Sequence, residues 1–285
     1  MLAISNKYPS KRAFITGTAS GLGEALSLLL AKDGWTIGMC DINEKGLVEI
    51  AEKVKQQGGQ AITYLLDTSN RQQFEQVAQN FLREVGGIDL LINNAGVGDG
   101  AFFHQYSLED WDWMIGINQM GVIYGCYFFV PRFQEQQKGH IINISSVASF
   151  SNGPGMSAYS LTKAAVRSLS ETLYYELAPF NVNVSVVMPS FFKTNIMKNG
   201  RGSESRVLSS AKKLVENAQF DAHTIALEIL KKAAQEKLNI ILPKEGRRMF
   251  WLSRIFPSIY RKQILKIAYK LHKRTSSKKQ AEKVN

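Results

Sequence analysis

TGTASGLG, residues 16–23, joins a short apolar run at 12–16 to a segment at 24–32 that carries leucines at helical spacing. Leu26, Leu29 and Leu30 share one side of that segment, which predicts a helix packed on a core. A glycine-rich turn placed between a strand and a helix is typical of dinucleotide-binding folds. Phosphates would then meet the positive end of the helix.

Each glycine of the turn has a separate role in such a site. Gly17 permits the tight turn, Gly21 lets the backbone approach a pyrophosphate, and Gly23 allows the helix to pack closely on the strand. Ser20 and Leu22 lie between them, and we expect both to contact the same cofactor. Three glycines in a turn can also mean only a turn, so the surrounding pattern matters.

That pattern is an alternation of short apolar runs and helical segments through residue 246. We expect strands at 12–16, 35–40, 61–66, 88–92, 140–144, 182–187 and 238–242. Apolar strands without in/out alternation indicate a parallel sheet that helices cover on both faces. The sequence therefore predicts an α/β, doubly wound, Rossmann-like sheet of about seven strands in a single domain, 1–246.

Asp41 ends the second expected strand, about 20 residues beyond the glycines, where an acid can bind the adenosine ribose hydroxyls. A carboxylate there would repel a 2′-phosphate, and Lys45 is the nearest base. This favours NAD over NADP. The alternative is that Asp41 is a turn acid or caps the next helix.

The formal net charge of +11 resides in the tail. Residues 247–285 hold twelve Lys/Arg and one acid, whereas 1–246 hold 23 of each sign. Tyr260, Ile264, Ile267 and Leu271 form an apolar stripe, with lysines on the opposite face, so 247–285 is predicted to be a basic amphipathic tail. Such a helix suits an anionic membrane surface, here through 247–274. Packing on the body or on another subunit is the alternative, and nucleic acid is not expected.

Cellular location is indicated by the cysteines and the N-terminus. Cys40 and Cys126 lie in apolar segments and should be two reduced core thiols. No signal peptide is visible, and the most apolar stretch, 121–130, is about half the length that a bilayer requires. We expect a cytoplasmic protein, with membrane association through the tail as an option.

Tyr159 and Lys163 are four residues apart, which places both on one face of a helix. A cation beside a phenol favours the phenolate and lowers its pKa toward a working range for acid/base chemistry. The spacing alone is weak, because Tyr269 and Lys273 repeat it in the tail.

Over residues 11–245 the chain resembles the classical short-chain dehydrogenase/reductase (SDR) family. The resemblance rests on ordered motifs: TGTASGLG (16–23), Asp67, NNAG (93–96), Asn118, ISS (144–146), YSLTK (159–163) and MPSFFKT (188–194). It implies a hydride transfer between NAD(H) and a carbonyl or alcohol, with Tyr159 as the general acid/base. By the same resemblance Lys163 holds the nicotinamide ribose and Ser146 binds the substrate oxygen. Asn118 holds a helix distortion and a water of the proton relay.

The family also implies the remaining cofactor contacts. Asn94, Ala95 and Gly96 would line the cofactor, with Asp67 at the adenine. Thr194 would bind the carboxamide, next to Pro189. The family pattern has glycine after that proline, whereas this chain has Ser190, which puts the substrate in doubt. No metal site is assigned, and the family implies a homodimer or homotetramer built on the helices at 111–133 and 158–178.

The substrate is expected to be hydrophobic, although aromatic residues are more often plain core. Residues 190–220 should form the substrate loop, which starts Ser190-Phe191-Phe192 and then becomes polar. Apolar walls are expected from Phe102, Phe103, Phe150 and Met156. The alternative function is a non-catalytic NAD(P)-sensing or scaffold protein at a membrane surface, for which the cofactor half of the site would suffice.

Overall fold

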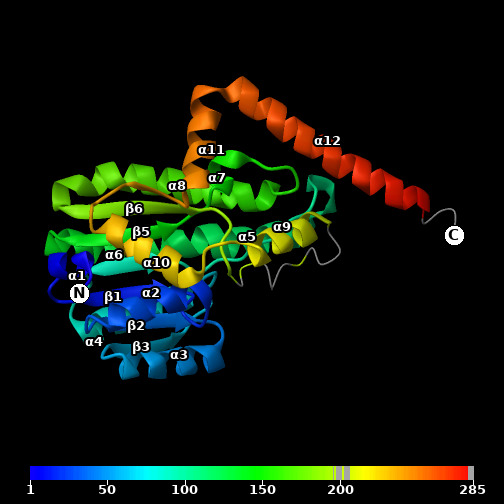
Figure 1. Cartoon of the computed structure of the whole chain (residues 1–285). Coiled ribbons are helices and arrows are strands. Elements are labelled where there is room, and N and C mark those ends of the chain that lie inside the picture. The colour runs from blue at the N-terminus through cyan, green and yellow to red at the C-terminus, as the bar shows by residue number, and fades with distance from the viewer. Residues whose placement is uncertain (195, 197–200, 202–205, 282–285) are drawn as a thin grey trace.

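Seven strands form one parallel sheet in the computed structural model, which describes residues 1–194, 196, 201 and 206–281. The strands are β1 (Arg12–Thr16), β2 (Thr36–Asp41), β3 (Gln60–Leu65), β4 (Leu90–Asn93), β5 (Gly139–Ile144), β6 (Val182–Pro189) and β7 (Asn239–Leu242). Their order across the sheet is β3-β2-β1-β4-β5-β6-β7, and every neighbouring pair is parallel (Figure 1). The doubly wound topology predicted from the sequence is confirmed, and its strand order reverses between β1 and β4.

Helices cover both faces of the sheet. The helices between strands are α2 (Gly21–Ala31), α3 (Glu44–Gln56), α4 (Arg71–Val85), α5 (Leu108–Ile115), α6 (Gly121–Gln136), α7 (Ala148–Ser151), α8 (Ser157–Leu177), α9 (Arg206–Glu216) and α10 (Ala222–Ala233). α1 (Ala3–Lys7) precedes the sheet. Side-chain oxygens cap the N-termini of several helices. At the beginning of α3, the Asn43 side chain accepts a hydrogen bond from the Gly46 amide at 3.1 Å.

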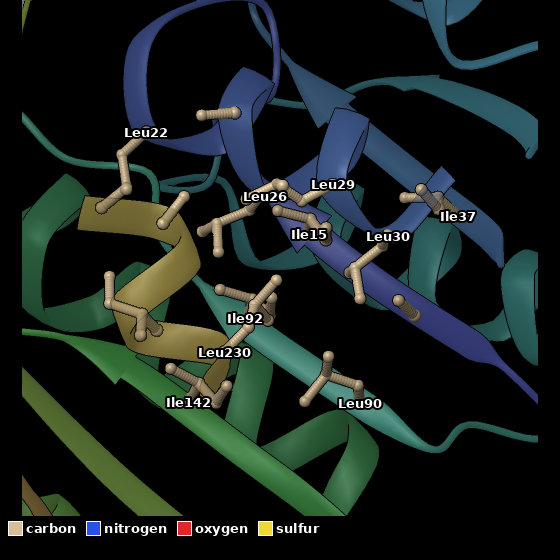
Figure 2. Packing of buried hydrophobic residues seen from close by; sticks show 14 of the residues in the cluster. Ile15, Leu22, Leu26, Leu29, Leu30, Ile37, Leu90, Ile92, Ile142 and Leu230 are labelled. Carbon is tan, nitrogen blue, oxygen red and sulfur yellow. The ribbon is translucent and has the colours of Figure 1, made fainter. Parts of the chain in front are cut away.

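The core has one apolar layer on each face of the sheet. On the first face, α2, α3 and α10 pack on the strands, and Figure 2 shows Leu26, Leu30 and Leu230 against Ile15 and Ile92. On the other face, α4, α6 and α8 bury a second, aromatic-rich cluster around Phe14. Both cysteines are buried and free, as expected from the sequence.

A single helix was expected at 111–133, but the structure divides this stretch. α5 ends at Ile115, a π-helical turn follows at Gly116–Met120, and α6 then continues the same rod. By length and composition alone, 108–136 could span a membrane, a criterion that core helices of globular proteins also meet. Here α6 packs on α4 and on β4 and β5, and it buries Phe129 and Phe133 in the core.

The segment 190–220 is not simply a polar loop. Its second half forms α9, which buries Val207, Leu208, Ala211 and Val215 along one side. The spacing of these residues is helical.

The tail consists of two helices, α11 (Lys244–Ile255) and α12 (Pro257–Ala281). α11 begins before residue 246, so the sequence boundary falls inside a helix whose Gly246 is buried against Val147 and Ile241. Figure 1 shows α11 rising from the body beside α7 and α12 running back above the side that carries α9. The packing of α11 agrees with the alternative that part of the tail contacts the body.

Candidate active site

A cavity of about 1080 Å³ opens at the carboxyl ends of the strands, on the side where the strand order reverses. Open α/β sheets bind ligands at this position. Most of the predicted site residues line it: Gly17, Ser20, Gly21, Leu22, Asp41, Asp67, Asn94, Ala95, Gly96, Ser146, Tyr159, Lys163, Pro189 and Thr194. The tertiary structure therefore brings together motifs that are spread over nearly 180 residues of sequence.

Gly23 and Asn118 do not line the cavity but support it. A Cβ on Gly23 would lie 2.0 Å from the Gly17 carbonyl oxygen, so only glycine lets α2 approach the turn this closely. Gly17 has a φ of +72° and Gly21 a φ of +62°, which glycine adopts readily. The turn therefore presents bare backbone at the start of α2, a surface suited to the pyrophosphate of a dinucleotide.

Asn94 braces the glycine turn. Its Nδ2 donates to the carbonyl oxygens of Thr16 (2.8 Å) and Gly17 (3.0 Å). The Thr16 hydroxyl in turn accepts from the amides of Asn94 and Ala95, both at 3.0 Å. Thr16, to which the sequence assigns no role, thus ties the end of β1 to the residues that follow β4.

Asp41 ends β2 beside the glycine turn. Its Oδ2 accepts a hydrogen bond from the Ala19 amide at 2.9 Å, and its Oδ1 accepts from the Asn43 amide at 3.0 Å. Asn43, rather than Asp41, caps α3. The bases among the described residues that line the cavity are Lys163 and Arg201, the latter stacked 4.6 Å above the Trp113 ring.

Asp67 and Thr194 both line the cavity. Asp67 follows β3, is exposed, and accepts from the Ser69 hydroxyl at 2.7 Å. Thr194 comes close to the turn, since a Cβ on Gly21 would lie 3.6 Å from its Oγ1. Both positions agree with a dinucleotide extended along the strand ends.

Ser146, Tyr159 and Lys163 converge at the other end of the cavity. Ser146 follows β5, its hydroxyl accepts a hydrogen bond from the Ala148 amide at 3.1 Å, and its proximity lowers the pKa of the Tyr159 phenol. The Lys163 ammonium lies 5.8 Å from the centre of the Tyr159 ring and donates to the Ile144 carbonyl oxygen at 3.0 Å. Ser145 is turned away, because its hydroxyl donates to the Lys163 carbonyl oxygen at 2.7 Å.

Asn118 sits, fully buried, in the π-helical turn. Its Nδ2 donates to the Val97 carbonyl oxygen (2.9 Å) and to the Thr162 hydroxyl (3.3 Å), and its Oδ1 accepts from the Val97 amide (2.8 Å). A Cβ on Gly96 would touch both Asn118 Oδ1 (3.0 Å) and Lys163 Nζ (3.3 Å). The helix distortion thus places Asn118 behind the loop 94–97, which lines the cavity.

The expected lowering of the tyrosine pKa is wrong for the protein by itself. Burial raises the pKa of Tyr159 to about 12, against a smaller lowering by the hydrogen bond with Ser146. Burial also lowers the pKa of Lys163 to about 8. Loss of water disfavours the charged form of both side chains.

The expected apolar walls are only partly correct. Met156 lines the cavity, but Phe103 is exposed and Phe150 packs on Phe250 of α11 at 5.1 Å between ring centres. Phe102 does not line it either. Further walls come from Phe191, Phe192 and α9, all within the segment 190–220 expected to form the substrate loop, and from α12, which the sequence places in the tail.

Comparison with known proteins agrees with this geometry. The model of the short chain dehydrogenase family matches residues 11–205. The 3-oxoacyl-(acyl-carrier-protein) reductase FabG of Thermotoga maritima is 35% identical over 188 residues, 66% of this chain and 76% of that protein. A diacetyl reductase ((S)-acetoin forming) of Staphylococcus epidermidis is 36% identical over 66% of this chain and 73% of that protein.

A solved structure is also similar to this chain. The crystal structure of a short chain dehydrogenase/reductase from Burkholderia phymatum in complex with NAD has a TM-score of 0.76 and 32% identity, and covers 81% of this chain and 88% of that chain. The matched family region ends before α9 and the tail. The chain belongs to the short chain dehydrogenase family and is an oxidoreductase that transfers hydride between a nicotinamide cofactor and a carbonyl or alcohol substrate.

Proposed function

We propose that the protein works as a reductase: NADH reduces the carbonyl group of a hydrophobic substrate, and Tyr159 supplies the proton. The observation that carries this proposal is the buried Ser146–Tyr159–Lys163 group at the end of the cavity. With its pKa raised to about 12 by burial, the phenol of Tyr159 is protonated at neutral pH and can donate its proton. The similar proteins from Thermotoga and Staphylococcus are both named as reductases.

Each residue of the site has its own role in this reaction. NADH, when bound, supplies a hydride to the carbonyl carbon. The Tyr159 hydroxyl donates its proton to the carbonyl oxygen, which also accepts a hydrogen bond from Ser146. Lys163 would hold the cofactor ribose and supply the proton that reprotonates Tyr159, and Asn118 would position a water of the proton relay. The product is an alcohol.

Tyr159→Phe tests the proposal. Removing a general acid lowers kcat by about 10²–10⁴, while NADH binding, followed by its fluorescence, should be retained. Ser157→Ala is a suitable control, since Ser157 begins the same helix and lies outside the cavity. Retained turnover in Tyr159→Phe would overturn the role of the tyrosine. Tight NADH binding without turnover of any alcohol or ketone would favour the non-catalytic sensor instead.

We also propose NAD rather than NADP as the cofactor. Asp41 would hydrogen-bond the ribose hydroxyls and repel a 2′-phosphate. Among the described lining residues, no base lies at that end of the cavity.

We also propose that the protein assembles as a homodimer or homotetramer. Tyr127 on α6, and Leu161 and Tyr175 on α8, are exposed apolar side chains on the two helices that would join subunits in a homodimer or homotetramer. Size-exclusion chromatography with light scattering tests this. A monomer at micromolar concentration would contradict it.

We propose that the tail touches an anionic membrane through the α11–α12 elbow of an otherwise cytoplasmic protein. Trp251, Ile255, Phe256 and Ile259 are exposed there, and Arg254 lies among them. Exposed aromatic and aliphatic side chains beside bases suit a lipid interface. The double variant Trp251→Ser/Phe256→Ser should then sediment less with phosphatidylserine vesicles. Unchanged sedimentation would exclude the α11–α12 junction as the membrane contact.

A further inference from the structure

The apolar stripe of α12 lies in the same cavity as the catalytic group. The stripe consists of Tyr260, Ile264, Ile267 and Leu271, and all four residues line the cavity that contains Tyr159. From the sequence, this stripe is predicted to face a membrane surface, with packing on the body or on another subunit as the alternative. In the structure, this stripe instead faces the cavity of the protein itself.

Two contacts hold α12 in this position. At its base, the ring of Phe250 in α11 packs edge-on against Phe150, with the guanidinium of Arg167 5.5 Å from its centre. One turn into α12, the Tyr260 hydroxyl donates to the Ser151 carbonyl oxygen at 2.8 Å. Ser151 ends α7, the short helix that follows Ser146, so α12 is joined to the substrate end of the site.

α9 forms the facing wall. Val207, Ala211, Leu214 and Val215 line the same cavity. Leu214 is 53% exposed and Ile267 is 49% exposed, so apolar side chains of both helices are open to solvent inside the cavity. Lys262, Lys266 and Lys270 are exposed on the opposite side of α12 and do not line the cavity.

We propose that α9 and α12 form a hydrocarbon channel that selects substrates with a long apolar chain. The inference rests on the proposed reductase function, whose substrate class it specifies. The reacting carbonyl lies at Ser146 and Tyr159, and the chain extends outward between the two helices. The stripe from Tyr260 to Leu271 is about 16 Å long, and a short ketone would leave it uncovered.

The test is kinetics with NADH and linear 2-alkanones from butan-2-one to decan-2-one, without vesicles. Each buried methylene should raise kcat/KM about fourfold, equivalent to about 0.8 kcal/mol. Ile267→Asp puts a charge in the wall and should lower the decanone-to-butanone ratio of kcat/KM at least tenfold. Leu265→Asp is the matched control, because Leu265 is 54% exposed on the same helix but lies outside the cavity.

The outcomes separate the channel from the reductase function. A wild-type ratio that does not rise with chain length, or equal effects of the two variants, overturns the channel. If no ketone is turned over, the reductase function fails, and stabilisation by decan-2-ol then decides on the channel. The alcohol should raise the Tm of the wild type and of Leu265→Asp but not that of Ile267→Asp; equal shifts, or none, overturn the inference.

Discussion

Replacing Lys163 by methionine should make the protein more stable at neutral pH while removing its activity. Lys163 is 2% exposed, and burial lowers the pKa of its ammonium group from 10.5 to about 8. A native pKa below the unfolded one means that the folded state disfavours the charge. The shift corresponds to about 3 kcal/mol of destabilisation at pH 7.

The pH dependence identifies the cause. Below about pH 8 the folded and unfolded chains both hold the proton, so the full penalty is present. Between about pH 8 and pH 10.5 the folded protein releases the proton and the unfolded chain keeps it, so the wild type becomes more stable as pH rises. At pH 10 less than about 1 kcal/mol of the penalty remains.

Lys163→Met removes this titration but also leaves the Ile144 carbonyl oxygen without its donor, which costs about 1–2 kcal/mol. We therefore expect the variant to be about 1–2 kcal/mol more stable than the wild type at pH 7 and no more stable at pH 10. Urea unfolding followed by circular dichroism across this range, at one protein concentration, measures the difference. Lys45→Met, on the exposed face of α3, should change stability by less than about 0.5 kcal/mol. A variant less stable than the wild type at pH 7, or a difference independent of pH, would refute the reasoning.

Three further changes test other parts of the structure. Asp41→Ala should raise the NADPH-to-NADH ratio of kcat/KM about tenfold or more, because a carboxylate no longer opposes the 2′-phosphate; an unchanged ratio would remove Asp41 from cofactor selection. Gly23→Ala should weaken NADH binding in a titration and cost about 1–3 kcal/mol of stability, since its Cβ would meet the Gly17 oxygen; wild-type affinity would contradict the close contact. Phe250→Ala should cost about 2 kcal/mol and speed amide exchange in α11, whereas Trp251→Ala, exposed on the same helix, should not; equal effects would mean that Phe250 does not anchor the tail.

Much of the fold could be predicted locally. The apolar runs near Phe14, Ile92 and Val184 are short and bounded by turns, and such runs, alternating with helical segments, are typical of the buried strands of a parallel sheet. The cofactor half of the site followed for the same reason. Glycines and acids that come directly after strands must collect at one edge of a parallel sheet.

The walls of the substrate end could not be predicted in this way. The helical spacing of Val207, Ala211 and Val215 is visible in the sequence, but nothing in it shows what the apolar side faces. The same holds for Ile264 and Ile267, whose pattern suits a membrane, a subunit or a pocket equally well. Only the fold, through the Tyr260–Ser151 contact and the packing of Phe250, directs that face into the cavity.

By itself, the sequence predicted the alternation of strands and helices and the position of the nicotinamide site, because both depend on residues in strands or close to a strand end, whereas the role proposed for Tyr159 came from the resemblance to a family. The tertiary structure decided the protonation of that tyrosine, the π-helical turn around Asn118 and the place of α12. These features depend on burial and contacts between segments far apart in the chain, such as those of Asn118 with Val97 and of Tyr260 with Ser151. Spacing to Lys163 predicted a lowered pKa for Tyr159, but burial by the whole fold raises it.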